Sequence, residues 1–339
     1  MGMLRIQRGL SLVELMVAML ISLIVLAGVG QIFLSSRETQ RSTHALSQVQ
    51  EAGRFAFDFI TADLRQVGYK GSCTGPMNIL LNETKASYIP DRFDLDNALR
   101  GWDDSSGSES ASMKGYVAET DVIQIKHAGV PPRCPATGLP VTATGNTPET
   151  AATISIDCTS GIKQGSIIVV ADAHGCDIFQ TTSNDSAKSL ARGSAAGFNP
   201  GNKGGNASFS HPYGTDMEIL LFQSATYYIG RDPTTNEPGL RMIRFNEGND
   251  VDGTAIIEEE LVRGIRSMQI TYGIDNDGDR SIDDFVVASA VSNWNAVLAV
   301  RVELIAQSTD AIDTADGKGT RERLEQTFST TIALRNRLP

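Results

Sequence analysis

Positive charge and catalytic motifs are what the sequence has least of. Lys and Arg number 29 against 40 Asp and Glu, which gives a formal net charge of −11 at pH 7. Because an acidic surface repels the phosphates of nucleic acids, this balance argues against a nucleic-acid partner. The 339 residues also contain no GxSxG, HExxH, Walker A or strand-to-helix GxGxxG motif. Nothing singles out a catalytic centre, and we expect that the protein is not an enzyme.

Histidine and cysteine are also scarce, with four of each in the chain. The cysteines lack the close spacing of a zinc ribbon or a redox pair. The histidines are scattered and show no metal-ligand spacing, so a metal site built on histidine is not expected. They are His44, His127, His174 and His211.

A long hydrophobic run at the N-terminus is the strongest feature that is present. Met1–Gly9 carries two arginines and no acidic residue, and Leu10–Leu34 is almost wholly apolar. About 20 residues suffice to cross the hydrocarbon core of a bilayer. The positive-inside rule then keeps the arginines cytoplasmic and places the rest of the chain outside. A secretory signal peptide cut near Ala27–Gly30 is the alternative, but the apolar pattern continues through that point to Leu34, which favours a single-pass segment.

Glu14 is the one charge inside this run. A carboxylate in a membrane span costs roughly 2.5–3.5 kcal/mol on insertion scales, so a partner or a function is expected. The alternative is that Glu14 lies near the cytoplasmic interface and reaches water there. The residues alone leave both interpretations of Glu14 open.

The string Arg8–Ala18, RGLSLVELMVA, closely resembles the class III signal of type IV prepilins and pseudopilins. That resemblance implies that a prepilin peptidase cuts between Gly9 and Leu10 and methylates the new amine of Leu10. The family usually has Phe at this position, so Leu10 is a mild departure. The resemblance also implies that Glu14, the fifth residue of the mature chain, contacts the N-terminal amine of a neighbouring subunit. Such a pair sets the register of assembly without necessarily adding net stability.

Helical periodicity continues beyond the apolar run. Apolar residues recur at steps of three and four, and no proline precedes Pro76. One helix is predicted from about Ser11 to Val67, roughly 85 Å long, with Gly68 as its C-cap. Gly28, Gly30 and Gly53 are weak points within it. The expected stripe and its widening positions are Leu46, Val49, Ala52, Phe55, Ala56, Phe59, Ile60, Leu64 and Val67.

Beyond Tyr69 the chain is predicted to be mostly β, with antiparallel sheets laid on the helix. The fold class is therefore α+β. The expected parts are residues 1–9, a leader; 10–34, the membrane half of the helix; 35–68, its amphipathic half; and 69–339, a β-rich domain. Gly101–Gly115 and Ser183–Gly214 lack periodicity, and the second either divides two sub-domains or is an exposed loop. The expected strands are Val122–Lys126, Thr153–Asp157, Ser166–Ala171, Ile219–Ile229, Leu240–Phe245, Ile256–Val262, Ser267–Ile274, Phe285–Ala290, Val297–Ala306 and Gln326–Leu334.

All four cysteines lie in the part expected to be exported, where oxidation is favoured. Cys158 and Cys176 flank the expected strand Ser166–Ala171 and are predicted to close a hairpin-sized loop. Cys73 is then left with Cys134, which is one of three connectivities for four cysteines. The alternative is that two or more are free buried thiols.

An acidic turn, DNDGDRSIDD, is the best candidate for a ligand site. The alternating carboxylates of Asp275, Asp277 and Asp279, with Asp283, are expected to point oxygens inward as Ca²⁺ requires. The pattern is not an EF-hand, because its glycine stands at the fourth position and no bidentate Glu closes it. The alternative is a hairpin turn between two strands with no ion.

Segments at both ends of the chain resemble the PilW family of large minor pilins of the type IV pilus. They are Gln50–Ala56, Asp63–Tyr69, Trp294, Val300–Leu304 and Phe328–Asn336. The resemblance implies a pilin fold and a place in a priming complex with other minor pilins, the major pilin and a large tip adhesin. It implies the inner membrane first, with a cytoplasmic N-terminus, a periplasmic domain and contact with the assembly platform, and the pilus tip later. The alternatives are a minor pseudopilin of type II secretion and a membrane-anchored module for Ca²⁺ binding or adhesion.

Overall fold

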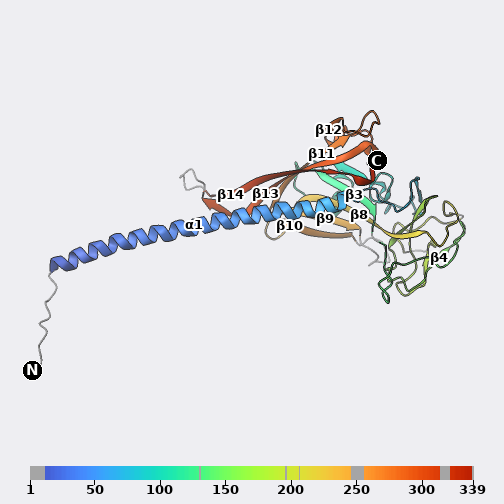
Figure 1. The fold of residues 1–339 in the computed structure, drawn as a ribbon, viewed down its shortest axis with the longest axis horizontal. Helices are drawn as coiled ribbons and strands as arrows, with labels where there is room; N and C mark the ends of the chain where they lie inside the picture. The colour runs from blue at the N-terminus through green and yellow to red at the C-terminus, as the bar shows by residue number, and fades with distance from the viewer. Residues whose placement is uncertain are drawn as a thin grey trace, which may run out of the picture.

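A long helix leads into a broad β-domain in the computed structural model, which describes residues 12–129, 131–194, 197–205, 207–245, 256–313 and 321–337. Helix α1 (Leu12–Leu64) projects from the domain as a single rod (Figure 1). Its N-terminal part stands alone, and its C-terminal part lies along β13, β14 and β10. The predicted α+β fold, with a long N-terminal helix packed on a largely antiparallel β-domain, is confirmed.

The C-terminal half of α1 buries one stripe of side chains, and the buried positions are three or four residues apart. Such spacing places all of them on one face of the helix. They are Ala45, Val49, Gly53, Ala56, Ile60 and Leu64. The predicted stripe was too wide, because Leu46, Phe55 and Phe59 are 43%, 40% and 43% exposed.

The end of α1 is tied to the domain by hydrogen bonds. Gly68 adopts the left-handed conformation expected of a C-cap, with φ of 72°, and its N–H donates to the Lys126 carbonyl at 3.0 Å. The Tyr227 hydroxyl donates to Asp63 Oδ2 at 2.6 Å. Burial, with the nearby Asp63 carboxylate, raises the pKa of Tyr227 far above its usual range. The phenol therefore stays protonated and keeps donating to the helix.

The larger sheet has eight strands in the order β1-β6-β5-β8-β3-β2, and β9 joins β8 to β10. β1 and β6 run parallel, and the other pairs run antiparallel. β5 reads IIVVA and all five residues are buried, as expected of a strand covered on both faces. The strands are β1 (Met77–Ile79), β2 (Leu99–Trp102), β3 (Val122–Ala128), β5 (Ile167–Ala171), β6 (Cys176–Gln180), β8 (Glu218–Arg231), β9 (Pro238–Phe245) and β10 (Ile256–Arg263).

The second sheet is antiparallel, with the order β12-β11-β13-β14. Its long strands β13 and β14 run beside α1 toward the N-terminal end of the molecule (Figure 1). The bounds are β11 (Ile265–Ile274), β12 (Asp284–Val286), β13 (Val297–Asp313) and β14 (Arg321–Ala333). Short helices fill the connections: α2 (Pro90–Phe93), and the 3-10 turns Gly107–Ser112, Ala288–Ala290, Trp294–Ala296 and Arg335–Arg337.

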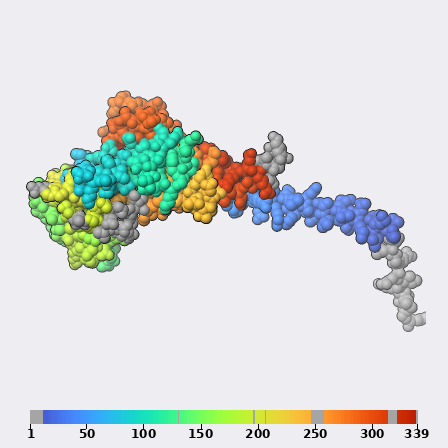
Figure 2. All heavy atoms as spheres, turned by 180° about the vertical axis from the view of Figure 1, so that it is seen from behind, coloured from blue at the N-terminus to red at the C-terminus, as the bar shows by residue number. Residues whose placement is uncertain are grey.

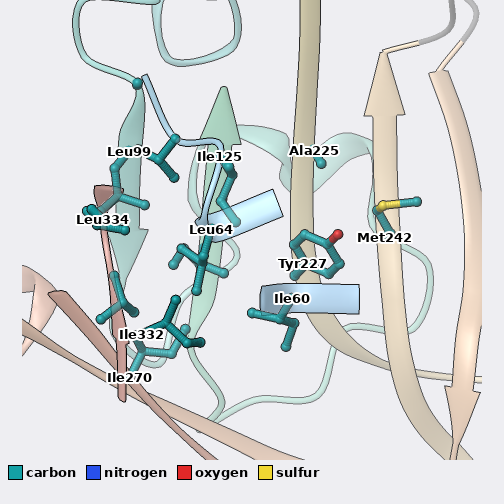
Figure 3. Packing of buried hydrophobic residues seen from close by; sticks show 14 of the residues in the cluster. Ile60, Leu64, Leu99, Ile125, Ala225, Tyr227, Met242, Ile270, Ile332 and Leu334 are labelled. Atoms are coloured by element: carbon teal, nitrogen blue, oxygen red, sulfur yellow. The ribbon is translucent and has the colours of Figure 1, made fainter. Parts of the chain in front are cut away.

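The main core forms where both sheets meet the end of α1. Ile60 and Leu64 have no exposed surface. Side chains from the larger sheet approach them from one side, and side chains from the second sheet from the other (Figure 3). The surrounding residues include Leu99, Ile125, Tyr227, Ile270, Ile332 and Leu334. Truncating such a buried Leu or Ile to Ala typically costs about 2–5 kcal/mol.

A second hydrophobic cluster covers the other face of the β5–β6 hairpin. Side chains of the hairpin, of Leu80 and of β8 meet there the described residues of 131–166 and 181–214, here called the distal lobe. The lobe contains the two-stranded sheet of β4 (Thr153–Ser155) and β7 (Ser189–Ala191). Ile167, Val169 and Ala171 face the main core, whereas Ile168 and Val170 face the lobe, as strand alternation requires. Figure 2 shows the lobe, in green and yellow, at the end of the molecule opposite the free part of α1.

The short strands β1, β2 and β7 were not predicted, and two further differences from the predicted strands have tertiary causes. The expected strand Phe285–Ala290 ends at Val286, and a 3-10 turn follows because Ala288 N and Ser289 N bond to the Asp103 carboxylate at 2.8 and 2.7 Å. Strand β6 (Cys176–Gln180) was missed altogether. It contains the fully buried polar residues Asp177 and Gln180, whose partners come from distant loops.

The predicted disulfide pairing was wrong. The bonds are Cys73–Cys176 and Cys134–Cys158, with Cα–Cα distances of 5.7 and 5.9 Å. Cys176 opens β6, which pairs in parallel with β1 and so comes close to Cys73. Cys158 instead lies in the distal lobe with Cys134. The first bond ties the end of α1 to the larger sheet, and the second closes a loop within the lobe.

Removing the longer cross-link should destabilise the protein more than removing the shorter one. The two bonds span 103 and 24 residues along the chain. Because loop-closure entropy grows with the logarithm of loop length, Cys73→Ser/Cys176→Ser should cost about 1 kcal/mol more than Cys134→Ser/Cys158→Ser. Urea unfolding of the detergent-solubilised protein measures both values. Peptide mapping without reduction checks the pairing, and a Cys158–Cys176 peptide would contradict it.

Gly53 should be required by the packing of β14 against α1. A Cβ at this position would lie 2.7 Å from two ring carbons of Phe328. Overpacking typically costs about 1–3 kcal/mol, against about 1 kcal/mol gained in helix propensity. Gly53→Ala should therefore lower the free energy of unfolding by up to about 2 kcal/mol.

Phe328→Ala supplies the matched background for this measurement. With the ring removed, Gly53→Ala should raise the free energy of unfolding by about 1 kcal/mol through propensity alone. The sign of the effect should thus reverse between the two backgrounds. The same stabilisation in both would show that Phe328 does not restrict position 53.

Candidate functional site

The N-terminal half of α1 is an apolar surface without cover. Every residue from Leu12 to Leu34 is exposed. Among the described helices, α1 is the one with the length and apolar composition to cross a membrane. The polar Ser22 hydroxyl donates to the Ala18 carbonyl at 2.8 Å, so it adds little cost in an apolar medium. This half of α1 is suited to a bilayer or to packing against other apolar helices.

The apolar surface ends at a defined point on α1. The guanidinium of Arg37 lies 4.6 Å from the centre of the Phe33 ring. Beyond it, Thr39 and Thr43 bond back to carbonyls one turn earlier, at 2.9 and 2.8 Å. A cation stacked on the last aromatic ring is the arrangement expected at an interface between apolar and aqueous surroundings.

The predicted processing residues are only partly described. Gly9 and Leu10 lie outside the described residues, so cleavage and methylation there stay predictions. Glu14 lies in the first turn of α1 and is exposed. An acidic residue in the first turn suits the positive end of the helix dipole. The role of Glu14 in assembly register also stays a prediction.

The acidic turn between β11 and β12 brings three of its four predicted ligands together. Carboxylate oxygens of Asp275, Asp277 and Asp283 lie within 4.8 Å of one another, and Asp279 is not in this group. Asp279 instead accepts a hydrogen bond from the Ser281 N–H at 2.7 Å. The turn is also closed by Asp283 Oδ2, which accepts the Asn276 N–H at 2.7 Å. Both predicted readings, a hairpin turn and a Ca²⁺ site, are compatible with this geometry.

Backbone hydrogen bonds keep the first carboxylate of this turn ionised. Asp275 accepts the N–H groups of Gly278 and Arg280 at 2.7 and 2.9 Å. Slight desolvation alone would raise the pKa of Asp275, but these hydrogen bonds outweigh it and lower the pKa. An ionised carboxylate is the form that a hard cation needs.

Calcium binding at the turn can be tested with one substitution and one control. Calorimetric titration of Ca²⁺ into the wild-type protein should give heat and a rise in melting temperature, and Asp277→Ala should lose both. Asp284→Ala, which removes a neighbouring exposed carboxylate outside the group, should keep them. No heat with the wild-type protein would leave a turn without an ion.

Two of the histidines that are scattered in the sequence come together in the structure. His174 and His211 are far apart in sequence, but their ring nitrogens and an Asp172 carboxylate oxygen lie within 4.8 Å of one another. The only local signal was the Asp-x-His spacing at Asp172 and His174, which is common in turns. The contribution of His211 depends on the fold of the distal lobe and has no sequence signal.

Comparisons with known proteins match segments near both ends of the chain. Residues 226–336 match the PilW family, described as type IV pilus-assembly protein W. Residues 4–30 match the prokaryotic N-terminal methylation motif. A pilin-like protein, PilA3 of Thermus thermophilus, is 39% identical over 72 residues, which cover 21% of this chain and 31% of that relative. The match thus spans about a third of the relative's length.

Both resemblances drawn from the residues are confirmed by these matches. The methylation motif covers the leader and the beginning of α1, and the family match covers the second half of β8 through β14. The distal lobe lies outside both matched ranges. Its function therefore has to be argued from its own residues.

Proposed function

We propose that this chain, a type IV pilin-like protein of the PilW family with an apolar N-terminal anchor, is a structural subunit that assembles at or near the pilus tip. The observation that carries the proposal is the division of α1 into two halves. The apolar half is exposed on all sides, and the other half is fixed in the core of the domain. An isolated apolar rod of this length is stable only in a bilayer or among other apolar helices.

Processing at the N-terminus would link these two environments. In the proposal, prepilin peptidase cuts between Gly9 and Leu10 and methylates Leu10 while α1 is in the inner membrane. Leaving the bilayer then moves the apolar half from lipid to neighbouring pilin helices. Glu14 would meet a neighbour's N-terminal amine, and because an unpaired charge is costly there, only the correct register is allowed.

The shape of the β-domain supports a place at the tip. The distal lobe extends beyond the C-terminal end of α1, away from the apolar half (Figure 1). In a filament of parallel helices, bulk in this position hinders the addition of a subunit above it. We therefore propose a priming complex in which this chain contacts other minor pilins, the major pilin below and a large tip adhesin. The inner-membrane assembly platform would hold the chain with its N-terminus cytoplasmic and its domain periplasmic.

A pseudopilin of type II secretion would use the same leader and the same helix. The match to a pilus-assembly family over residues 226–336 favours the pilus. A membrane-anchored module that never enters a filament would need neither cleavage after Gly9 nor Glu14. These differences define the experiment.

The test replaces Gly9 and Glu14 separately and follows both maturation and assembly. Gly9→Ala should abolish cleavage, because the leader of this class of signal ends in Gly, and should leave unprocessed protein in the membrane. Glu14→Gln keeps the shape of the side chain but removes its charge. It should be cleaved normally, yet its recovery in sheared pili should fall at least about tenfold, the effect of roughly 1.4 kcal/mol in assembly.

Glu38→Gln is the matched control for loss of one carboxylate on the same helix. Glu38 lies beyond the apolar half, so this variant should be processed and recovered like wild type. Normal-sized product from Gly9→Ala would contradict processing at this position. Unimpaired recovery of Glu14→Gln would remove the proposed role of Glu14, and absence of wild-type protein from sheared pili would favour the anchored module.

A further inference from the structure

The turn of the β5–β6 hairpin and the loop 207–213 of the distal lobe meet at a cluster that pilus assembly does not use. Asp172 follows β5, and His174 and Gly175 complete the turn. Ser210 and His211 come from the loop. The cluster belongs to the part of the chain outside both family matches.

Three side chains of this cluster converge on one point. His211 Nε2 lies 2.9 Å from Asp172 Oδ2, and His174 Nδ1 lies 3.8 Å from Asp172 Oδ1. All three groups offer ligand atoms within 4.8 Å of one another. Asp172 and His211 are largely buried, with side chains 10% and 20% exposed, whereas the His174 side chain is 82% exposed.

The ring of His211 is fixed from several directions. Its Nδ1 lies 3.0 Å from Ser210 Oγ, and its ring centre lies 4.2 Å from that of the buried Tyr213. Gly175 makes the approach possible, because a Cβ there would lie 2.9 Å from Ser210 Oγ and 3.0 Å from His211 Nδ1. Asp172 is fixed too, since its Oδ1 accepts the N–H groups of His174 and Gly175 at 2.7 and 3.1 Å. These bonds and that of His211 outweigh the opposing effect of burial and lower the Asp172 pKa.

The hydrogen-bond network assigns the proton on His211. The Ser210 hydroxyl donates to Asp177 Oδ2 at 2.7 Å, and Asp177 is fully buried. Ser210 Oγ can then only accept from the His211 ring, so Nδ1 carries the hydrogen in the neutral tautomer. Nε2 is left with a lone pair that faces the Asp172 carboxylate at 2.9 Å. A metal ion that is bound by both of these atoms would satisfy this contact.

We propose that Asp172, His174 and His211 bind a Zn²⁺ ion. Zinc binds histidine nitrogen at about 2.0–2.1 Å and carboxylate oxygen at about 2.0–2.2 Å, which places tetrahedral ligands about 3.3 Å apart. The observed separations, 2.9 Å from His211 to Asp172 Oδ2 and 3.8 Å from His174 to Asp172 Oδ1, lie on either side of that value, so the two oxygens of one carboxylate face the two rings. Two nitrogen ligands select zinc over the hard cation Ca²⁺. Three protein ligands leave the fourth position to water.

The hydrogen bond on the other side of the His211 ring suits a metal-bound histidine. A metal-bound histidine usually donates its other ring N–H to a fixed acceptor, which here is Ser210 Oγ, itself anchored on buried Asp177. The same network argues against a hydrolytic Ser-His-Asp arrangement, because the Ser210 proton is committed to Asp177 and not to His211. Free cysteine thiols cannot compete for the ion, since all four cysteines form disulfides.

The test is calorimetric titration of Zn²⁺ into the full chain in detergent, unreduced and with a histidine-free affinity tag. The wild-type protein should bind one ion at this site. His174→Ala and His211→Ala should each weaken binding by at least about 100-fold. Ser210→Ala removes only the acceptor that orients His211 and should weaken binding about 10–100-fold. Tetrahedral Co²⁺ should give a visible absorption band that is lost in His211→Ala.

His44→Ala is the matched control, because His44 is an exposed histidine on α1 away from the lobe. It should bind Zn²⁺ like wild type. Equal binding by His174→Ala, His211→Ala and wild type would assign the heat to adventitious ions and overturn the proposal. No saturable heat with the wild-type protein would show that Asp172 and His211 contact each other without a metal ion, which would also overturn the proposal. Circular dichroism of each variant separates loss of the site from loss of the fold.

Discussion

The burial of one helical stripe between two sheets is the contact on which the rest of the molecule depends. Ile60 and Leu64 lie where both sheets meet, and Gly53 lets β14 approach α1 closely. Because α1 is a single continuous helix, fixing its C-terminal half also fixes the direction of its apolar half. The domain thereby holds about 20 exposed apolar residues in one helix. A helix of this length and composition can span a bilayer or pack among other pilin helices.

The β5–β6 hairpin connects the main core around α1 to the distal lobe. One face of the hairpin completes the main core, and the other is the floor of the distal lobe. Cys73–Cys176 locks the hairpin to the segment that follows α1. The lobe is therefore attached to the core around α1 through this hairpin, at the end of the molecule opposite the apolar half of the helix (Figure 1). An ion held by Asp172, His174 and His211 would stiffen the connection between the hairpin turn and the lobe.

Local patterns in the sequence were enough for the helix and for most strands. The predicted helix from Ser11 to Val67 and the observed Leu12–Leu64 agree closely, because a four-residue apolar repeat and Gly68 are local signals. The apolar N-terminal run and its prepilin-type motif could also be identified from the local sequence. Strand β6 was not predicted, because the buried polar side chains of Asp177 and Gln180 look like those of loop residues until Tyr213 and Gly201 provide their partners. The disulfide error followed from that missing strand, and the cluster at His211 depends on the same tertiary contacts.

Mass spectrometry of the mature N-terminus tests the central claim most directly. The protein would be isolated from cells that carry prepilin peptidase and from cells that lack it. We expect a chain that begins at N-methylated Leu10 in the first case and an intact leader in the second. An N-terminus near Ala27–Gly30, or an intact Met1 in both, would mean that the apolar half of α1 is not the processed stem of a pilin. The β-domain would then be an exported or anchored module with a different function.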